Sequence, residues 1–234
     1  MALPKLNTPQ YELELPSTGK KIKYRPWLIK EQKNLMIAQE SEDDKEIESA
    51  FANIVSECTF GAIDPYENPL FDIEYIFLQL RGKSIGQKLT LNLLCPDDGK
   101  TEVKHEIDLE DVAIQMPDNH TNTVQITDDI SMIMRYPKLS DMAGFTEEGQ
   151  IKQIFDMIKR CVGEIHDGKT IHNKVDISDK ELDEFIDSMS QSNFELVSNF
   201  FETMPKLIHV VSVTNPKTKK KNKITIEGLQ SFFV

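Results

Sequence analysis

The stretch YELELPSTGKKIKYRPW, residues 11–27, predicts the first structural element of the chain. Apolar side chains alternate with glutamates over residues 11–15, which is the period-two pattern of a strand with one buried face. Residues 16–19 are turn formers, and residues 20–24 return as a second strand. Pro26 has no backbone N–H to donate and ends the ladder. The stretch therefore predicts a hairpin of two antiparallel strands that ends at Pro26.

Helical spacing begins directly after this hairpin. Residues 28–60 carry apolar side chains three and four positions apart, interrupted by the charged block 40–46. Two helices are therefore favoured over one long helix, with Ser41 or Asp44 available to cap the second. A third helix is expected over residues 68–81, where the apolar residues form one stripe.

Hairpins return later in the chain. Residues 88–94 and 102–109 flank the dense turn signal Cys95–Gly99, which predicts a second hairpin. The tail repeats this layout, with strands at 208–213 and 224–226 around a lysine-rich turn. Further short strands are expected over residues 112–115, 123–127, 130–136 and 228–234.

The chain becomes helical again after Pro137. Apolar residues between Ile151 and Val162 predict one helix, and Ser178 with Glu181 forms the capping-box pattern that starts another. A further helix ends at Met204-Pro205, and the segment containing His166 and His172 is interpreted as a loop.

These elements predict an α+β fold in which helical units alternate with short antiparallel hairpins. Helices followed by a hairpin occur twice, which suggests a faint internal duplication. We expect an N-terminal section, residues 1–137, and a C-terminal section, residues 138–234, which can also pack as one domain.

The charge balance narrows the class of partner. The chain has 234 residues, 39% of them hydrophobic and 28% charged, with a formal net charge of -12. An acidic chain is poorly suited to bind nucleic acid or anionic lipid, both of which need a basic face. No stretch has the run of apolar residues that a membrane span needs, and the N-terminus lacks a signal core. The expected location is intracellular.

Cysteine and histidine usage indicates no metal or redox chemistry. The three cysteines, Cys58, Cys95 and Cys161, are widely spaced, which fits a reducing cytoplasm better than a disulfide framework. Cys95-Pro96 resembles half of a zinc knuckle, but Asp98 occupies the position of the second thiol. The tail hairpin has no cysteine, so the usual four ligands cannot be assembled.

No catalytic or nucleotide-binding motif is present either. The phosphate-binding loop, the dinucleotide-binding turn and the serine nucleophile elbow are all missing from the sequence. Pairs of neighbouring carboxylates lie in expected turns or at helix starts, where they act as caps. The sequence assigns no catalytic residue, cofactor site, metal site or small-molecule substrate.

A lysine cluster at the tip of the tail hairpin is the exception to the acidic balance. It comprises Lys217, Lys219, Lys220, Lys221 and Lys223. One interpretation is a soluble turn whose charges protect a strand from aggregation. The other is an electrostatic contact, with an acidic protein surface rather than with nucleic acid.

Several motifs in order along the chain resemble one family. The first is KKIKYRPWLIKEQK at residues 20–33, preceded by LELPSTG at 13–19. Arg135-Tyr136-Pro137, NFFETMP at 199–205 and IEGLQSFF at 226–233 follow. Together they resemble the baseplate hub subunit and hub-assembly proteins of T-even-type bacteriophages, and the resemblance covers nearly the whole chain.

The resemblance implies a non-enzymatic role in phage tail morphogenesis. The expected partners are other baseplate hub or tail proteins, met in the host cytoplasm during assembly and in the tail baseplate of the virion. No catalytic residue comes with the family. Some relatives carry paired cysteines in the hairpin turns, whereas this chain keeps only Cys95, which argues against an inherited metal site. A transient assembly chaperone, absent from the virion, is the alternative, and an unrecognised hydrolase is a third.

The candidate interface residues are aromatic or lie beside aromatic residues. Tyr24, Pro26 and Trp27 can staple the hairpin onto the helices or meet a partner, and Arg25 can pair with an acid of the next helix or with that partner. The apolar groups near the end of the last helix and at the chain terminus are either a core wrapped on both sides or a contact surface. These groups are Phe200, Phe201, Met204, Phe232 and Phe233.

Overall fold

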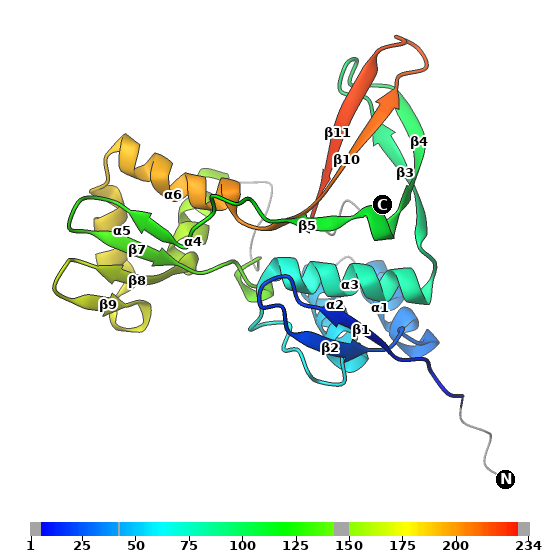
Figure 1. Cartoon of the computed structure of the whole chain (residues 1–234), viewed down its shortest axis with the longest axis horizontal. Coiled ribbons are helices and arrows are strands. Elements are labelled where there is room, and N and C mark those ends of the chain that lie inside the picture. Colours follow the sequence, from blue (N-terminus) through cyan, green and yellow to red (C-terminus); the bar gives the residue numbers. More distant parts are fainter. Residues whose placement is uncertain (1–5, 42, 143–149, 229–234) are drawn as a thin grey trace. The chain divides into compact units, whose positions relative to one another are not determined.

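The computed structural model describes residues 6–41, 43–142 and 150–228 (Figure 1). Their contacts divide the chain into two compact units. Unit 1 combines the chain up to Gln115 with the segment from Lys206 onward, and unit 2 is Met116–Pro205. The sections 1–137 and 138–234 expected from sequence do not coincide with these units. Whether the chain folds as one domain or two stays a prediction.

Unit 1 contains most of the elements. They are β1 (Tyr11–Glu14), β2 (Lys21–Tyr24), α1 (Ile29–Ser41), α2 (Asp44–Cys58), α3 (Leu70–Ser84), β3 (Lys88–Leu94), β4 (Glu102–Asp108), the 3-10 turn η1 (Leu109–Asp111), β5 (Ala113–Gln115), β10 (Lys206–Thr214) and β11 (Lys221–Glu227). β1 pairs with β2 and β3 with β4, both antiparallel, while β10 lies between β11 and β5. The pairing of β10 with β5 brings the tail into unit 1.

Helix α3 is the centre of unit 1. Its side chains Ile73, Ile76 and Phe77 pack into a hydrophobic cluster with the β1–β2 hairpin, α1 and α2. Leu78, on another face of the helix, packs with the hairpins β3–β4 and β10–β11. A helix that is apolar on more than one face is buried on more than one face. Figure 1 shows α3 between these two layers of unit 1.

A polar clasp joins the turns of the β3–β4 and β10–β11 hairpins. The Asp97 carboxylate accepts hydrogen bonds from the amides of Asn215, at 2.9 Å, and Asn222, at 3.0 Å, and from the Thr218 hydroxyl. The Asp97 N–H donates back to the Asn222 side-chain oxygen at 3.2 Å. Asn215 and Asn222 are buried, and buried polar groups are stabilised only when they are paired. The clasp therefore fixes one hairpin tip against the other.

Unit 2 is a four-stranded antiparallel sheet with helices on one face. The strands, in spatial order, are β6 (Thr123–Gln125), β7 (Ser131–Met134), β8 (Val162–His166) and β9 (Ile171–Asn173). The other elements are η2 (Leu139–Met142), α4 (Gln150–Cys161), η3 (Lys174–Asp176), α5 (Asp179–Asp187) and α6 (Gln191–Thr203). Met132 and Met134 on the sheet meet Leu182 of α5 and Val197 of α6 in one core.

Most of the expected elements are confirmed, and the α+β class with them. Asp43, rather than Ser41 or Asp44, caps α2 by accepting a hydrogen bond from the Lys45 N–H at 2.8 Å. The capping box of Ser178 and Glu181 is present. The strand expected at 228–234 falls almost entirely outside the described residues.

The loop expected at Asp167-Gly168 is present, but His166 and His172 were wrongly placed in it, because they lie in β8 and β9. β8 follows α4 with no breaker between them, and all three residues of β9 are exposed, so neither strand shows the usual alternation. Gly163 is the extra residue of a bulge opposite β7, and a side chain there would stand 3.1 Å from the Ile133 carbonyl oxygen. None of the helices in the described ranges combines the length and apolarity of a membrane-spanning helix.

Loss of the clasp should destabilise unit 1. Asn215→Ala removes one of the three side-chain donors to the Asp97 carboxylate and leaves two turn amides without their acceptor, and we expect a loss of roughly 1–3 kcal/mol in the free energy of unfolding. Trp27, the only tryptophan, lies in unit 1, so urea titration followed by its fluorescence measures this unit. Asn92→Ala, on the exposed face of β3, is the control. Equal midpoints for the two variants would show that the clasp is not stabilising.

Candidate protein interface

The signature around Arg25 lies where the first hairpin passes into α1. Pro26 follows the end of β2, and α1 begins after Leu28, whose carbonyl accepts hydrogen bonds from the N–H groups of Glu31 and Gln32. The Glu31 carboxylate in turn accepts a hydrogen bond from the Leu28 N–H at 2.7 Å. This is the return half of a capping box, in which an acid in the first turn pairs with an otherwise unpaired amide.

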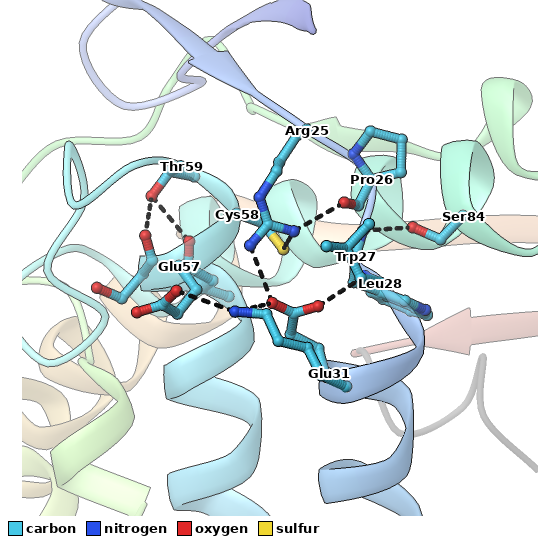
Figure 2. Close-up of polar contacts among 12 residues, drawn as sticks. Arg25, Pro26, Trp27, Leu28, Glu31, Glu57, Cys58, Thr59 and Ser84 are labelled. Carbon is cyan, nitrogen blue, oxygen red and sulfur yellow. Dashed lines mark hydrogen bonds and ion pairs between the residues drawn. The ribbon is translucent and has the colours of Figure 1, made fainter. Parts of the chain in front are cut away.

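Arg25 connects three parts of unit 1 (Figure 2). Its Nη2 atom lies 2.9 Å from Glu31 Oε1, at the start of α1. Its Nη1 atom donates to the Pro26 carbonyl at 3.0 Å and lies 3.6 Å from the sulfur of Cys58. Its backbone N–H donates to the Cys58 carbonyl at 2.9 Å, at the end of α2. The Arg25 junction, defined as Arg25, Glu31 and Cys58, therefore holds hairpin, helix start and helix end together.

The charges of the Arg25 junction stabilise each other. Burial by itself raises the pKa of the Glu31 carboxyl, but hydrogen bonds from Arg25 and the Leu28 N–H outweigh it, so this pKa lies below its usual value. The Glu31 side chain is 6% exposed and that of Arg25 is 12% exposed. Lys30 adds an exposed bridge from Glu31 to Glu57. Burial raises the pKa of the Cys58 thiol to about 11, which keeps it protonated and unreactive.

The same junction occurs in unit 2 around Arg135. Its guanidinium forms a bidentate pair with Asp141, six residues later, at 2.6 and 2.9 Å. The Lys138 N–H donates to Asp141 at 2.8 Å, and Arg135 Nη1 donates to the next carbonyl, that of Tyr136, at 3.1 Å. The Arg135 N–H donates to the carbonyl of Cys161, the last residue of α4, at 2.8 Å.

Four contacts of the Arg25 junction thus have a counterpart in the Arg135 junction: the ion pair with an acid six residues later, the backbone N–H bound by that acid, the bond to the next carbonyl, and the backbone bond to a cysteine at a helix end. Cys58 and Cys161 both lie at a helix C-terminus, and both are fully buried. Burial raises the pKa of the Cys161 thiol to about 12. This repetition supports the internal duplication inferred from the sequence.

Aromatic side chains reinforce the first junction. The Trp27 ring centroid lies 5.1 Å from that of Phe77 on α3. The backbone N–H of Trp27 donates to the Ser84 hydroxyl at 2.9 Å. Tyr24 packs against Tyr11 across the hairpin, with ring centroids 5.6 Å apart. Tyr24, Pro26 and Trp27 are all buried. Trp27 thereby links the end of the hairpin to α3, and Tyr24 packs in the same hydrophobic cluster as the helices.

Phe200 and its neighbour Phe201 occupy different environments. Phe200 is 2% exposed and lies in an aromatic group with His120, at 5.2 Å, and Tyr136, at 5.9 Å. Phe201 meets Phe200 edge to face at 5.1 Å and is partly exposed, as is Met204 after the end of α6. Adjacent positions on a helix point in different directions, so α6 buries only one of the two rings fully.

The candidate interface residues are therefore placed differently. Tyr24, Pro26, Trp27 and Phe200 lie inside their units, whereas Arg25, Phe201 and Met204 reach the surface in part. Phe232 and Phe233 lie outside the described residues. An interface role for any of them stays a prediction. The expectation that Arg25 pairs with an acid of the next helix is confirmed.

Sequence reasoning did not single out the acids and cysteines of the two junctions. The available signal was an acid six residues after an arginine that follows a strand, which occurs at Glu31 and again at Asp141. At the zinc-like turn, Asp98 binds its own loop by accepting from the Thr101 hydroxyl at 2.6 Å. Within the described ranges, no three His, Cys, Asp or Glu side chains gather as metal ligands.

Comparison with known proteins places this arrangement in a family. The family model described as T4 bacteriophage base plate protein matches residues 8–234. The chain belongs to this family. Its role is accordingly in the phage baseplate, as a structural or assembly protein. The chain is also 25% identical, over 96% of its length and 98% of the relative, to the "Baseplate hub assembly protein gp26" of Enterobacteria phage T4. No solved structure matches the chain significantly.

The Arg25 junction should be a main stabilising element of unit 1 of this baseplate protein. Glu31→Gln leaves the buried guanidinium without its charge partner, and breaking such a pair costs roughly 3–5 kcal/mol. Urea titration followed by Trp27 fluorescence measures the loss. Glu57→Gln removes only the exposed bridge to Lys30 and should cost less than about 1 kcal/mol. Similar losses in the two variants would contradict this assignment.

The depressed pKa of Glu31 also predicts a pH dependence. A carboxyl whose pKa is lower in the folded state stabilises the fold above its unfolded pKa, and this contribution is lost as pH falls through the folded pKa. The free energy of unfolding of unit 1 should therefore fall below about pH 4, near the ordinary pKa of glutamate. Glu31→Gln should flatten this dependence when urea midpoints are measured at each pH. An unchanged slope would exclude Glu31 as its source.

Proposed function

We propose that this protein takes part in building the central hub of the baseplate, as a hub subunit or hub-assembly factor, through contacts with other baseplate proteins. The observation that carries the proposal is the similarity to the hub assembly protein of phage T4, which extends over nearly the full length of both chains. The family match over residues 8–234 supports the same setting.

The arrangement of charged groups supports a role without catalysis. Three of the carboxylates whose pKa values are lowered are engaged in structure: Glu31 and Asp141 hold their arginines, and Asp97 holds the clasp. The thiols of Cys58 and Cys161 are buried and protonated. Catalytic acids and bases instead converge on a shared cleft. An unrecognised hydrolase has no comparable observation in its favour.

The expected site of action is the host cytoplasm during assembly, with other hub or tail proteins as partners. The test is a phage lacking the gene. We expect electron microscopy of infected-cell lysates to show no complete baseplates, and a plasmid copy of the wild-type gene to restore them. Complete baseplates without the gene, together with no tail protein recovered by affinity pull-down of the tagged chain, would refute the proposal.

The same phage tests the exposed end of α6. Met204→Glu changes a partly exposed residue, so the fold should persist, as checked by circular dichroism. If the end of α6 is an interface, baseplate restoration should fail with this variant. Glu202→Gln, an exposed change on the same helix, is the matched control and should restore baseplates. Normal restoration by Met204→Glu would exclude this surface.

Mass spectrometry of purified virions separates a hub subunit from a transient chaperone. A subunit is present in fixed proportion to the other hub proteins. An assembly factor that leaves before maturation is absent from the particle, although its loss abolishes baseplates.

A further inference from the structure

The turn of the β10–β11 hairpin carries an exposed positive charge that the fold leaves unbalanced. Five lysines lie within residues 217–223, and all are exposed. Within the described part of the chain, none of their ammonium groups forms an ion pair. The chain as a whole is strongly acidic, with a net charge of -12, so such a local surplus of positive charge is unusual for it.

The first hairpin pairs its lysines with acids, whereas this one does not. In β1–β2, Lys21 stands opposite Glu14, and Lys23 stands opposite Glu12. Directly opposed charges of unlike sign stabilise a sheet pair and lower its net charge.

In β10–β11, by contrast, Lys221 stands opposite Thr214 and Lys223 opposite Ser212. Lys221 and Lys223 therefore have no acid directly opposite them across the hairpin. The β3–β4 hairpin follows the first pattern, since Lys88 lies 2.8 Å from Glu106 on the neighbouring strand.

The fold also holds the basic turn in one conformation. The buried Asn215 side chain accepts hydrogen bonds from the N–H groups of Lys217, at 2.8 Å, and Thr218, at 3.2 Å. Asp97 then holds Asn215 and Thr218 from the neighbouring hairpin. Lys219 adopts a φ of 63°, a left-handed conformation that is unfavourable for a residue with a side chain. The backbone that carries the lysines is thus preorganised, which lowers the entropy lost on binding.

The same face offers an apolar contact. Val210 is 50% exposed and lies on the outer side of β10, in line with Ser212 and Thr214, while Val211 and Val213 face the core. A surface with several lysines around one exposed valine fits an acidic protein segment that also carries an apolar side chain. Nucleic acid fits it less well, because no aromatic residue is present for base stacking on residues 217–223.

We propose that the outer face and turn of the β10–β11 hairpin, the lysine face, is a docking site for an acidic segment of a partner protein. Its residues are Val210, Ser212, Thr214, Lys217, Lys219, Lys220, Lys221 and Lys223. The inference deepens the proposed function, on which it rests for the partner being a protein of the baseplate. Among the described residues, β11 is also the outer strand of its sheet.

Binding to the full chain can be measured by fluorescence anisotropy with a short labelled peptide of glutamate and valine. Lys221→Gln/Lys223→Gln should weaken binding at least about tenfold, and raising salt from ~50 to ~200 mM should weaken wild-type binding too. Lys21→Gln/Lys23→Gln removes the same charge from β2 and should bind like wild type. Circular dichroism checks that both variants fold.

The remaining outcomes are decisive as well. Equal peptide affinity for the wild type and both variants, or no peptide binding at low salt, overturns the lysine face. Tighter binding of a single-stranded oligonucleotide of the same length overturns it in favour of nucleic acid. Aggregation of Lys221→Gln/Lys223→Gln, with peptide affinity per folded molecule unchanged, means that the lysines only protect the strand edge.

The gene-deleted phage links the lysine face to hub building. Wild-type rescue with failure of Lys221→Gln/Lys223→Gln supports the docking site. Equal rescue by both overturns it while the proposed function stands. Complete baseplates without any gene copy would overturn the proposed function instead, and the peptide measurement would still test the surface.

Discussion

The fold depends on one electrostatic constraint: an arginine at the end of a strand needs a carboxylate as its ion-pair partner once its guanidinium is removed from water. In unit 1 Arg25 finds it in the first turn of α1, where Glu31 also caps the helix. The backbone N–H of Arg25 also donates to the Cys58 carbonyl at the end of α2. One residue therefore binds the start of one helix and the end of another. A buried pair of this kind adds little net stability compared with an apolar replacement, but it is costly to break.

The repetition of this junction around Arg135 is consistent with the internal duplication that the sequence suggests. The chain uses the same set of contacts twice, although the carboxylate is supplied by glutamate in one case and aspartate in the other. The surroundings have diverged. The Asp141 side chain belongs to a short 3-10 turn and accepts from a more exposed arginine, whereas Glu31 belongs to a full helix. The same contacts in different surroundings are consistent with a junction that determines the path of the chain.

Buried polar groups play a similar part between the two long hairpins. The buried amides of Asn215 and Asn222 and the partly exposed Asp97 carboxylate satisfy one another across more than a hundred residues of sequence, and a buried amide would be costly alone. In a baseplate protein such groups serve to hold a defined surface for partners, which is compatible with function by binding.

The sequence by itself determined the local elements. The period-two pattern of residues 11–15, the capping box at Ser178 and the turn Cys95–Gly99 each depend on neighbours in the chain, so they can be predicted without the fold. The ordered motifs also sufficed to indicate the family. The Arg25 pairing was foreseeable because its acid lies only six residues away.

Tertiary structure alone decided the rest. The return of β10 to pair with β5, the clasp at Asp97 and the strands β8 and β9 depend on residues that are remote in sequence or only weakly patterned. Whether an aromatic side chain is buried, as Trp27 and Phe200 are, depends in the same way on which surface packs against it. Pairing between distant segments leaves almost no local signal, because its energy comes from contacts that exist only after the chain has folded.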